Sequence, residues 1–344
     1  MYAYPIQQFG VDHLEQVPLP MLQIAPGMVL IKVHAVSLNY RDLMMVKGLY
    51  NPKMALPRIP CSDGAGEIVA VGEGVSRVGV GDRVCGIFMQ RWLDGPPTAE
   101  KSKAALGGDV DGMLAEYVLL SQDGVVVFPE HLSYEEAATL PCAGVTAWNA
   151  LQFAGVPSHP VISGETVVIQ GTGGVSIFAL QFAKLLGATV IGTSSSDEKL
   201  NRAYGLGLDA GCNYKERPDW SKWVIETTGS LGADRIIEVG GAGTFGQSLR
   251  AARVGGMVAQ IGVLSGAAVT DSLALTPILH KLLHVQGIYV GSRAMFEQMN
   301  AAIAKATLRP VIDRVFGADQ VQEAFLHMQS ASHFGKIVIR MTQS

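Results

Sequence analysis

Cysteine is scarce in this sequence, and the few that occur are scattered. The chain has four cysteines in 344 residues, and no two of them form a CxxC pair. A chain of this length can bury a core of its own, so it does not depend on disulfides for stability. The sequence therefore predicts reduced thiols and a cytoplasmic protein. The cysteines are Cys61, Cys85, Cys142 and Cys212.

Long apolar runs and an excess of basic charge are also absent. No stretch of about 18 residues is apolar throughout, as a membrane span requires. The start, MYAYPIQQFGVDHLEQ, lacks the basic and apolar regions of a secretory signal. The formal net charge is -4, whereas a protein that neutralises several phosphates needs a basic face. We therefore expect a small-molecule substrate, and neither a membrane nor a nucleic acid as partner.

The first third of the chain is rich in predicted β-strands, which glycine and proline separate. This spacing favours a small barrel or sandwich. A helix is predicted over 133–152, because Ser133 and Glu136 form a capping-box pattern before a helix-friendly run. The polar loop 94–112 is expected to be exposed and mobile. The predicted strands cover residues 29–38, 65–72 and 115–120.

In the second half of the chain, apolar strands alternate with amphipathic helices. Such an alternation is typical of an α/β fold with a doubly wound parallel sheet. We predict this sheet as one domain over residues 129–293. A barrel-like, β-rich domain is predicted from residues 1–128 and 294–344, with the tail packing back onto the first part. The predicted strands of the sheet are 166–170, 188–194, 234–240, 256–262 and 285–291, and its predicted helices are 175–187, 197–207 and 243–254.

A glycine-rich loop joins the strand 166–170 to the helix that follows it. Gly171 allows a tight turn, and Gly173 lets the backbone approach a pyrophosphate at the start of the helix. Ser176 replaces the third glycine of the fingerprint and is small enough for the helix to pack on the strand. The alternative is a plain turn in a domain without a ligand. The candidate cofactor-binding residues of the loop are Gly171, Thr172, Gly173, Gly174 and Val175.

The end of the next strand predicts which dinucleotide binds. An NAD site places an acidic residue there to hold the ribose hydroxyls, but here Ser194 and Ser195 occupy the strand end and Lys199 follows within a turn. Hydroxyls and an ammonium bind the 2′-phosphate of NADP, which a carboxylate would repel. Asp197 is interpreted as the N-cap of the next helix, the alternative being that it turns toward the ribose. Tyr214 is either near the adenosine or a surface aromatic.

Together these segments resemble the medium-chain dehydrogenase/reductases, and among them the zinc-free quinone oxidoreductase and enoyl-reductase branch. The resemblance covers nearly the whole chain. It implies a GroES-like catalytic domain, a Rossmann domain, a site in the cleft between them, and a homodimer or a dimer of dimers. The segments that carry it are NYRD (39–42), GDRV (81–84), CAGVTAW (142–148), VVIQGTGGVSIFALQFAKLLGATVIGTSSSDEKL (167–200) and HFGKIVI (333–339).

The resemblance also implies that no metal is bound. In zinc-dependent members a Cys, a His and a second Cys hold the catalytic zinc. The matching positions here are Asn39, Ser62 and Cys142, with Asp63 beside the second. An amide and a hydroxyl are poor zinc ligands compared with thiolate and imidazole. Cys142 is interpreted as a small buried apolar residue. The eight histidines show neither HxH nor HExxH spacing, so none is assigned to a metal.

Without a metal, hydrogen-bond donors must stabilise the negative charge that forms on a carbonyl oxygen. The segment after the strand 29–38 offers three catalytic candidates, which are Asn39 through its amide, Tyr40 through its hydroxyl, and Asp42. The alternative is a solvated polar turn in which Arg41 pairs with Asp42.

Three further residues complete the predicted cofactor site. The resemblance implies that Thr146 lies near the nicotinamide and that Lys336 reaches the pyrophosphate. Gly262, at the end of the strand 256–262, is the third.

The leading hypothesis is a zinc-independent enzyme that uses NADPH to reduce a quinone or an activated C=C bond. A metal-free NAD(P)-dependent alcohol dehydrogenase or carbonyl reductase is the first alternative. The second is a structural or regulatory protein that binds NADPH without turnover, as some lens crystallins of this family do.

Overall fold

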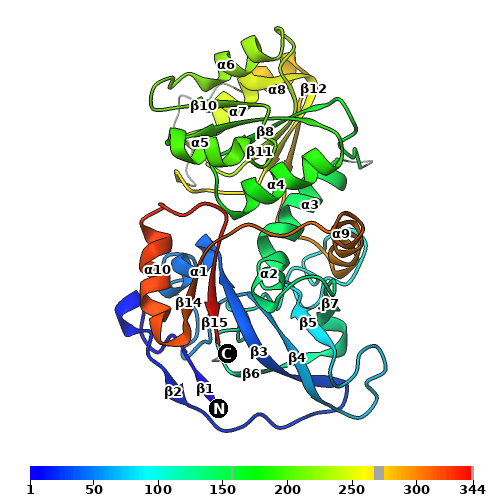
Figure 1. Cartoon of the computed structure of the whole chain (residues 1–344), viewed down its shortest axis with the longest axis vertical. Coiled ribbons are helices and arrows are strands. Elements are labelled where there is room, and N and C mark those ends of the chain that lie inside the picture. Colours follow the sequence, from blue (N-terminus) through cyan, green and yellow to red (C-terminus); the bar gives the residue numbers. More distant parts are fainter. Residues whose placement is uncertain (156–157, 267–274, 342–344) are drawn as a thin grey trace. The chain divides into compact units, whose positions relative to one another are not determined.

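The computed structural model describes residues 1–155, 158–266 and 275–341. The chain divides into two compact units (Figure 1). The first unit is Met1–Val145 with Val290–Ser344, and the second is Thr146–Tyr289. The predicted division at 129 is earlier than the observed one, because helix α2 (Tyr134–Ala137) and the turn after it pack on strands of the first unit.

Within the described residues, the second unit is built on a six-stranded sheet. Its strands are β8 (Thr166–Gln170), β9 (Thr189–Ser194), β10 (Ala210–Asn213), β11 (Ala233–Glu238), β12 (Ala252–Gln260) and β13 (His284–Gly287). They follow the order β10-β9-β8-β11-β12-β13, and every neighbouring pair is parallel. The order reverses between β8 and β11, where open sheets of this kind bind ligands. The predicted doubly wound sheet is confirmed.

The strand sequences explain why the sheet of the second unit is buried. In β8, Val167, Val168 and Ile169 are each at most 1% exposed, as expected of an apolar run in a parallel strand covered on both faces. The sequence does not predict β10, because this strand contains only AGCN and has no β-branched residue. Helix α6 (Trp220–Thr227) is not predicted either. The helices are α3 (Val145–Gln152), α4 (Gly174–Leu185), α5 (Asp197–Tyr204), α6 (Trp220–Thr227), α7 (Phe245–Ala251) and α8 (Thr276–His280).

In its described part, the first unit holds a seven-stranded sheet and a two-stranded one. The strands are β1 (Tyr2–Ala3), β2 (Val17–Pro18), β3 (Met28–Leu38), β4 (Asp63–Val71), β5 (Arg83–Gly86), β6 (Tyr117–Ser121), β7 (Val125–Val127), β14 (Ile312–Gly317) and β15 (Lys336–Arg340). The helices are α1 (Tyr40–Val46), α2, α9 (Arg293–Ala306) and α10 (Val321–Gln329). The larger sheet follows the order β14-β15-β3-β4-β5-β7, and β6 also pairs with β3.

The 11-residue strand β3 is long enough to share one edge between two partners. Its first part, from Met28 to Lys32, pairs with β6, and its last part, from Ala35 to Leu38, pairs with β15. The C-terminal strand therefore completes a sheet that the N-terminal third begins. The predicted return of the tail to the first domain is confirmed.

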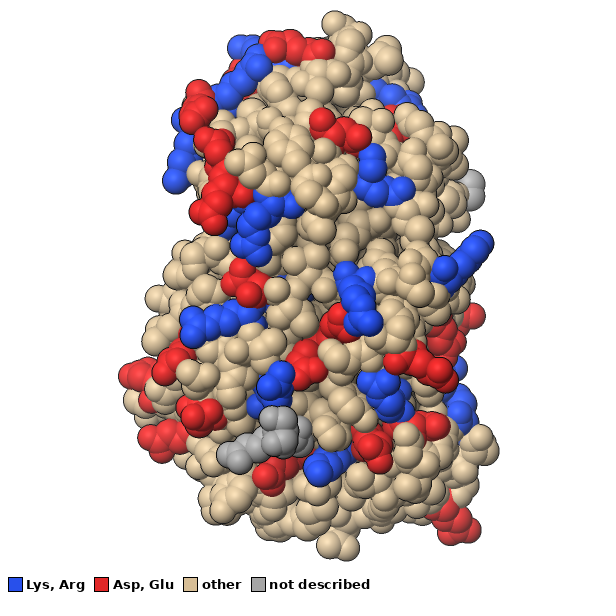
Figure 2. Space-filling model, viewed as in Figure 1, with Lys and Arg blue, Asp and Glu red and all other residues tan. Residues whose placement is uncertain are grey.

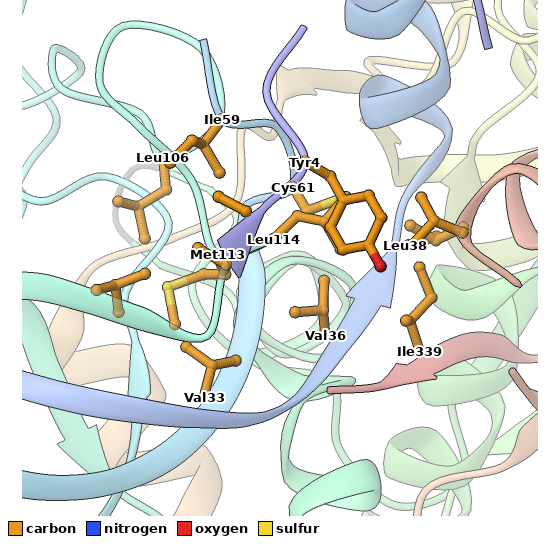
Figure 3. Packing of buried hydrophobic residues seen from close by; sticks show 14 of the residues in the cluster. Tyr4, Val33, Val36, Leu38, Ile59, Cys61, Leu106, Met113, Leu114 and Ile339 are labelled. Atoms are coloured by element: carbon orange, nitrogen blue, oxygen red, sulfur yellow. The ribbon is translucent and has the colours of Figure 1, made fainter. Parts of the chain in front are cut away.

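A bulge in β3 lets side chains on either side of it enter the same apolar cluster. The register with β4 shifts between Val33 and Ala35, which changes the phase of the alternation. Figure 3 shows Val33, Val36 and Leu38 in this cluster, where Ile339 of β15 also packs. Because Leu38 is only 1% exposed, the core fixes the end of β3, which is where the catalytic candidates begin.

The loop 94–112 differs from its prediction as a wholly exposed segment. Its first part is exposed, but Ala105 and Leu106 are at most 3% exposed, and Ala105 bridges to Met89. The apolar residues within the polar run explain this burial, since removing them from water is favourable.

Charges of both signs are intermixed on the face of the molecule shown in Figure 2. This mixture fits the small formal net charge of -4. Among the residues that the structure describes, no helix has both the length and the apolar composition needed to cross a bilayer.

Candidate functional site

In the first unit, the C-terminal end of β3 lies beside the N-terminal ends of its two neighbours, β4 and β15. β3 runs antiparallel to both β4 and β15, and Leu38 at its end pairs with Ile337. The next residue, Asn39, therefore meets the first residues of the other two strands, which are Asp63 and Lys336. The register thus brings together Asn39, a predicted catalytic residue, and Lys336, a predicted cofactor ligand.

Asn39, Ser62, Asp63 and Lys336 form a closed circuit of polar contacts, called the polar ring below. The Lys336 ammonium donates to Asn39 Oδ1 at 2.5 Å and to the Leu38 carbonyl at 2.8 Å. It also lies 3.7 Å from Asp63 Oδ2. Asn39 Nδ2 contacts Ser62 Oγ at 3.5 Å, and Ser62 Oγ donates to Asp63 Oδ1 at 2.8 Å.

Three of the four members of the polar ring are withdrawn from solvent. Ser62 and Asp63 are 0% exposed and Lys336 is 3% exposed, whereas Asn39 is half-buried. Burial raises the pKa of Asp63, and the Lys336 charge and hydrogen bonds from Asn39 and Ser62 oppose that rise. Asn39 is therefore the member of the ring that a substrate can reach.

Asp42 is buried in the first turn of α1 and holds the backbone of Asn39. Its Oδ2 accepts the Asn39 backbone N–H at 2.8 Å, while its Oδ1 has no hydrogen-bond partner among the described residues. Burial raises the pKa of Asp42 to about 6, and the positive charge of Arg41 limits that rise. The carboxylate of Asp42 caps this turn, and the Asn39 side chain is directed to the polar ring instead.

Tyr40 and Arg41 have different surroundings although they are adjacent. Tyr40 is 44% exposed. Arg41 donates from Nη1 to the Leu106 carbonyl at 2.8 Å, and its guanidinium lies 4.7 Å from the centre of the Phe88 ring. The Tyr40 hydroxyl is therefore accessible to a ligand, whereas Arg41 anchors the buried part of the loop 94–112.

Cys142 lies in a π-helical turn, Leu140–Gly144, that packs on β4. Its backbone N–H donates to Asp63 Oδ2 at 3.2 Å. The side chain is half-buried, less buried than predicted. Burial, and then the negative charge of Asp63, raise the pKa of the thiol. Cys142 therefore stays protonated at neutral pH, and a thiol is a weaker nucleophile and metal ligand than a thiolate.

In the second unit, the glycine loop has the geometry that its fingerprint predicts. Gly171 has a φ of +68°, which strains any residue with a Cβ, and α4 begins directly after Gly173. A Cβ added to either glycine would meet no atom within 4 Å, so the loop faces open space. Ser176 donates from Oγ to the Gln170 carbonyl at 2.7 Å and so ties the helix to the strand. The loop and the first turn of α4 also contain Thr172, Gly174 and Val175.

Ser194 ends β9 and lies beside Tyr214, so the structure brings these two candidates together. The Ser194 carbonyl accepts the Tyr214 N–H at 3.0 Å. Ser194 is 2% exposed and its Oγ accepts the Ser196 N–H at 3.3 Å, while Tyr214 is 41% exposed. Ser195 and Lys199 are half-buried. Ser195 is therefore the more accessible of the two predicted hydroxyls.

The prediction that Asp197 caps α5 is wrong. Ser196 is the N-cap, because its Oγ accepts the Lys199 N–H at 3.3 Å. The Asp197 carboxylate instead accepts a hydrogen bond from Asn213 Nδ2 at 3.0 Å. Asn213 ends β10, a strand that the sequence does not predict, so this contact was not foreseeable from the residues around Asp197.

A buried carboxylate that the sequence analysis missed organises the loop after β11. Glu238 is 0% exposed and accepts hydrogen bonds from the N–H groups of Gly240 and Gly241 at 2.8 and 2.9 Å. It also accepts from Thr244 Oγ1 at 2.6 Å and from Gln170 Nε2 at 2.8 Å. Gln170 is the last residue of β8, so Glu238 links the two loops at the point where the strand order reverses. An acid near the end of the predicted strand 234–240 was the available signal.

Gly262 and Thr146 complete the predicted cofactor set. A Cβ at Gly262 would lie 2.2 Å from the Val239 carbonyl oxygen, so only glycine fits there. Thr146 is 3% exposed and lies in the first turn of α3. All predicted cofactor residues except Lys336 belong to the second unit.

Both units match known sequence families. The pattern described as "Alcohol dehydrogenase GroES-like domain" matches residues 25–130, and "Zinc-binding dehydrogenase" matches residues 174–305. A zinc-type alcohol dehydrogenase-like protein of Schizosaccharomyces pombe is 44% identical, over 96% of each chain. The chain belongs to the medium-chain dehydrogenase/reductase family. It is thus an oxidoreductase, and the prediction of a GroES-like domain with a Rossmann domain is confirmed.

Relatives within the family differ in their reactions. An acryloyl-coenzyme A reductase of Metallosphaera sedula is 28% identical over 92% of each chain. A crystal structure of a candidate alcohol dehydrogenase from Sinorhizobium meliloti is 42% identical, with a TM-score of 0.91 over 99% of this chain and 98% of that one. A 2-octenoyl-CoA carboxylase reductase, solved with NADP and 2-octenoyl-CoA, is 25% identical, with a TM-score of 0.85 over 96% of this chain and 82% of that one.

The family description names zinc, but the residues of the polar ring do not suit it. Structural and catalytic zinc sites use thiolate, imidazole and carboxylate ligands, whereas two of the three matching positions here are Asn39 and Ser62. The Lys336 ammonium already bonds to Asn39, and it would repel a second cation. Among the described residues, no three or more His, Cys, Asp or Glu side chains are grouped so as to hold a metal.

Proposed function

We propose that this protein uses NADPH to reduce a carbonyl-conjugated C=C bond, or a quinone, without a metal ion. The polar ring carries the proposal, because a buried ammonium bonds to the amide of Asn39, a residue that the family resemblance aligns with a zinc ligand. The acryloyl-coenzyme A reductase and the 2-octenoyl-CoA carboxylase reductase among the similar proteins support a conjugated C=C substrate.

The second unit supplies the residues that NADPH requires. When bound, NADPH supplies the hydride. The N–H groups at the start of α4 and the open space above Gly171 suit the pyrophosphate. Ser195 and Lys199 are assigned to the 2′-phosphate, with Ser194 shaping the strand end and Tyr214 beside it.

In the proposed reaction, Asn39 Nδ2 donates a hydrogen bond to the substrate carbonyl oxygen. This bond stabilises the negative charge that develops there as the C=C bond accepts a hydride. Tyr40, exposed in the first turn of α1, is assigned as the proton donor to the substrate. Asp42 is assigned to positioning, since its carboxylate holds the Asn39 backbone.

Steady-state NADPH oxidation across quinones, enones, enoyl thioesters and aldehydes tests this proposal. We expect turnover with at least one conjugated substrate, unchanged by a metal chelator. The variant Asn39→Ala should lower kcat by about 100-fold, the usual loss when one donor to a developing oxyanion is removed.

Alcohol oxidation is the second candidate, and the 44% identical alcohol dehydrogenase-like relative favours it. Turnover of simple alcohols and aldehydes that exceeds that of every conjugated substrate would replace the leading proposal by this one. Tight NADPH binding without any turnover would instead favour the structural or regulatory role.

We also propose that two copies pair along β13, which ends the described strand order of the second unit. Val285 of β13 is 40% exposed, and Leu279 and Leu282 before it are 70% and 69% exposed. Exposed strand edges of this kind are usually covered. Light scattering should give a dimer or a dimer of dimers at micromolar concentration, and Val285→Lys should shift the protein toward monomer. A monomeric wild type contradicts the proposal.

A further inference from the structure

The Asn39 amide is held asymmetrically in the polar ring. Its oxygen accepts from the Lys336 ammonium at 2.5 Å. Its nitrogen contacts Ser62 Oγ at 3.5 Å, the outer limit for a hydrogen bond, and also bonds to the adjacent Asp63 carboxylate. Because Ser62 and Asp63 are neighbours and Nδ2 carries two N–H groups, one N–H serves these contacts and the other retains donor capacity. The half-buried Asn39 is also the ring member with access to solvent.

We propose that Lys336 is a positioning residue that orients and polarises the Asn39 amide, so that Asn39 Nδ2 faces the substrate carbonyl. This inference rests on the proposed function of Asn39. The ammonium bonds only to acceptors, so it selects the rotamer in which Oδ1 faces Lys336; one N–H of Nδ2 then faces Ser62 and Asp63, and the other is left for the substrate. A positive charge on the amide oxygen also draws electron density from the nitrogen, which makes its N–H groups stronger donors.

The rest of the ring holds Lys336 at this position. The ammonium donates hydrogen bonds to the Leu38 carbonyl and to Asn39 Oδ1, and it also lies 3.7 Å from Oδ2 of the Asp63 carboxylate. Asp63 is itself fixed by the Ser62 hydroxyl and by the Cys142 N–H at 2.8 and 3.2 Å. The ring therefore places one fixed positive charge behind the donor.

Burial separates this role from the one that the family resemblance implies for Lys336. A lysine that binds a pyrophosphate must present its ammonium to the ligand, but Lys336 is 3% exposed and its bonds are made within the first unit. The two roles predict opposite kinetics. A phosphate ligand sets NADPH affinity, whereas a group that orients Asn39 sets the rate at saturating NADPH.

The test compares Asn39→Ala, Lys336→Met and the double variant, with Lys103→Met as the matched control. Lys103 pairs with Glu100 on the exposed loop 94–112. We expect Lys336→Met to lower kcat at least tenfold, with the NADPH dissociation constant changed less than twofold. Lys336→Arg should recover part of the rate, because it keeps the charge. The double variant should be no slower than Asn39→Ala, because Lys336 acts through Asn39.

Two results would overturn the inference. One is an NADPH dissociation constant raised tenfold or more, and more salt-dependent, with kcat unchanged, since this identifies a phosphate ligand. The other is an additive loss of kcat in the double variant. If the wild type turns over no substrate, the proposed function fails, and the Lys336 inference is then judged by denaturant unfolding of the wild type, Asn39→Ala, Lys336→Met and the double variant. Coupling between Asn39 and Lys336 in stability supports the contact, and its absence contradicts it.

Removing Lys336 alone leaves Asp63 buried without its positive neighbour, and that variant risks not folding. The double variant Asp63→Asn, Lys336→Met removes both charges at once and keeps the ring uncharged. We expect it to fold, to bind NADPH normally and to show the same low kcat as Lys336→Met. A wild-type kcat in this uncharged ring also contradicts the proposal.

Discussion

The candidate residues of the first unit and those of the second unit are of different chemical kinds. In the second unit, the glycine loop offers mostly backbone N–H groups, and most of it comes from consecutive residues between β8 and α4. In the first unit, the polar ring is made of side chains from three separate segments of the chain, and all of them but Asn39 are buried. A loop that binds phosphate offers exposed backbone N–H groups, whereas a buried charge is stable only where other side chains pair with it away from water.

This difference predicts that the first unit depends more on single side chains. Replacing Asp63 by Ala removes the carboxylate that faces Lys336 and leaves the ammonium buried without it. We expect a loss of about 3–5 kcal/mol in the free energy of unfolding, the usual cost of breaking a buried pair. Urea denaturation measures it. The exposed Asp94→Ala should stay within about 0.5 kcal/mol of the wild type, and equal stability of both variants would remove the contrast between the two regions.

The buried carboxyl Asp42 should give the first unit a dependence on pH. Its pKa is about 6 in the folded protein, above the ordinary aspartate value of 3.8. The folded state therefore binds the proton more tightly than the unfolded state, so this contribution is full below about pH 4 and is lost as the pH rises through 6. The size is at most about 3 kcal/mol. The variant Asp42→Asn should flatten the stability curve between pH 4 and 6. A curve parallel to that of the wild type would show that Asp42 does not titrate in this range.

In the second unit, the expected effects are on cofactor choice. A charge-assisted hydrogen bond to the 2′-phosphate is worth about 1.5–3 kcal/mol, or about 10- to 150-fold in affinity, so NADPH should bind at least tenfold more tightly than NADH. Ser194→Asp should shift the preference toward NADH by repulsion. Lys199→Ala should weaken NADPH and leave NADH nearly unchanged.

Fluorescence titration gives both dissociation constants for these proteins. If the wild type binds both cofactors equally, or if Lys199→Ala loses the same affinity for both, these residues do not recognise the 2′-phosphate. Asp197→Asn is the informative control, because that carboxylate is already held by Asn213 and its removal should change the preference little.

The smallest expected effect is that of metal removal. Because Asn39 and Ser62 stand at two of the three zinc-ligand positions, dialysis against a chelator should change neither activity nor melting temperature. Elemental analysis of the purified protein should find far less than one zinc per chain. About one equivalent of zinc, lost together with activity on chelation, would contradict the proposed metal-free reaction.

Local sequence was sufficient for the glycine loop. The strand–loop–helix around Gly171 and Gly173 was predicted within one or two residues, because a tight turn after an apolar strand is a property of adjacent residues. The cap of α5 shows the limit of such reasoning. Ser196 and Asp197 are both suitable caps, and the choice depended on Asn213 from a strand 16 residues away in sequence.

The fold family and the parallel sheet could be predicted from the sequence, and the resemblance aligned Asn39 and Ser62 with zinc-ligand positions. That Lys336 lies beside Asn39, and not at an exposed ligand site, could be seen only in the folded protein. The reason is physical. A helix or a tight turn is set by contacts within a few residues, but the meeting of Asn39, Asp63 and Lys336 depends on the register of three antiparallel strands. That register is fixed by the bulge in β3 and by the core packed around it, which depend on residues from the whole first unit.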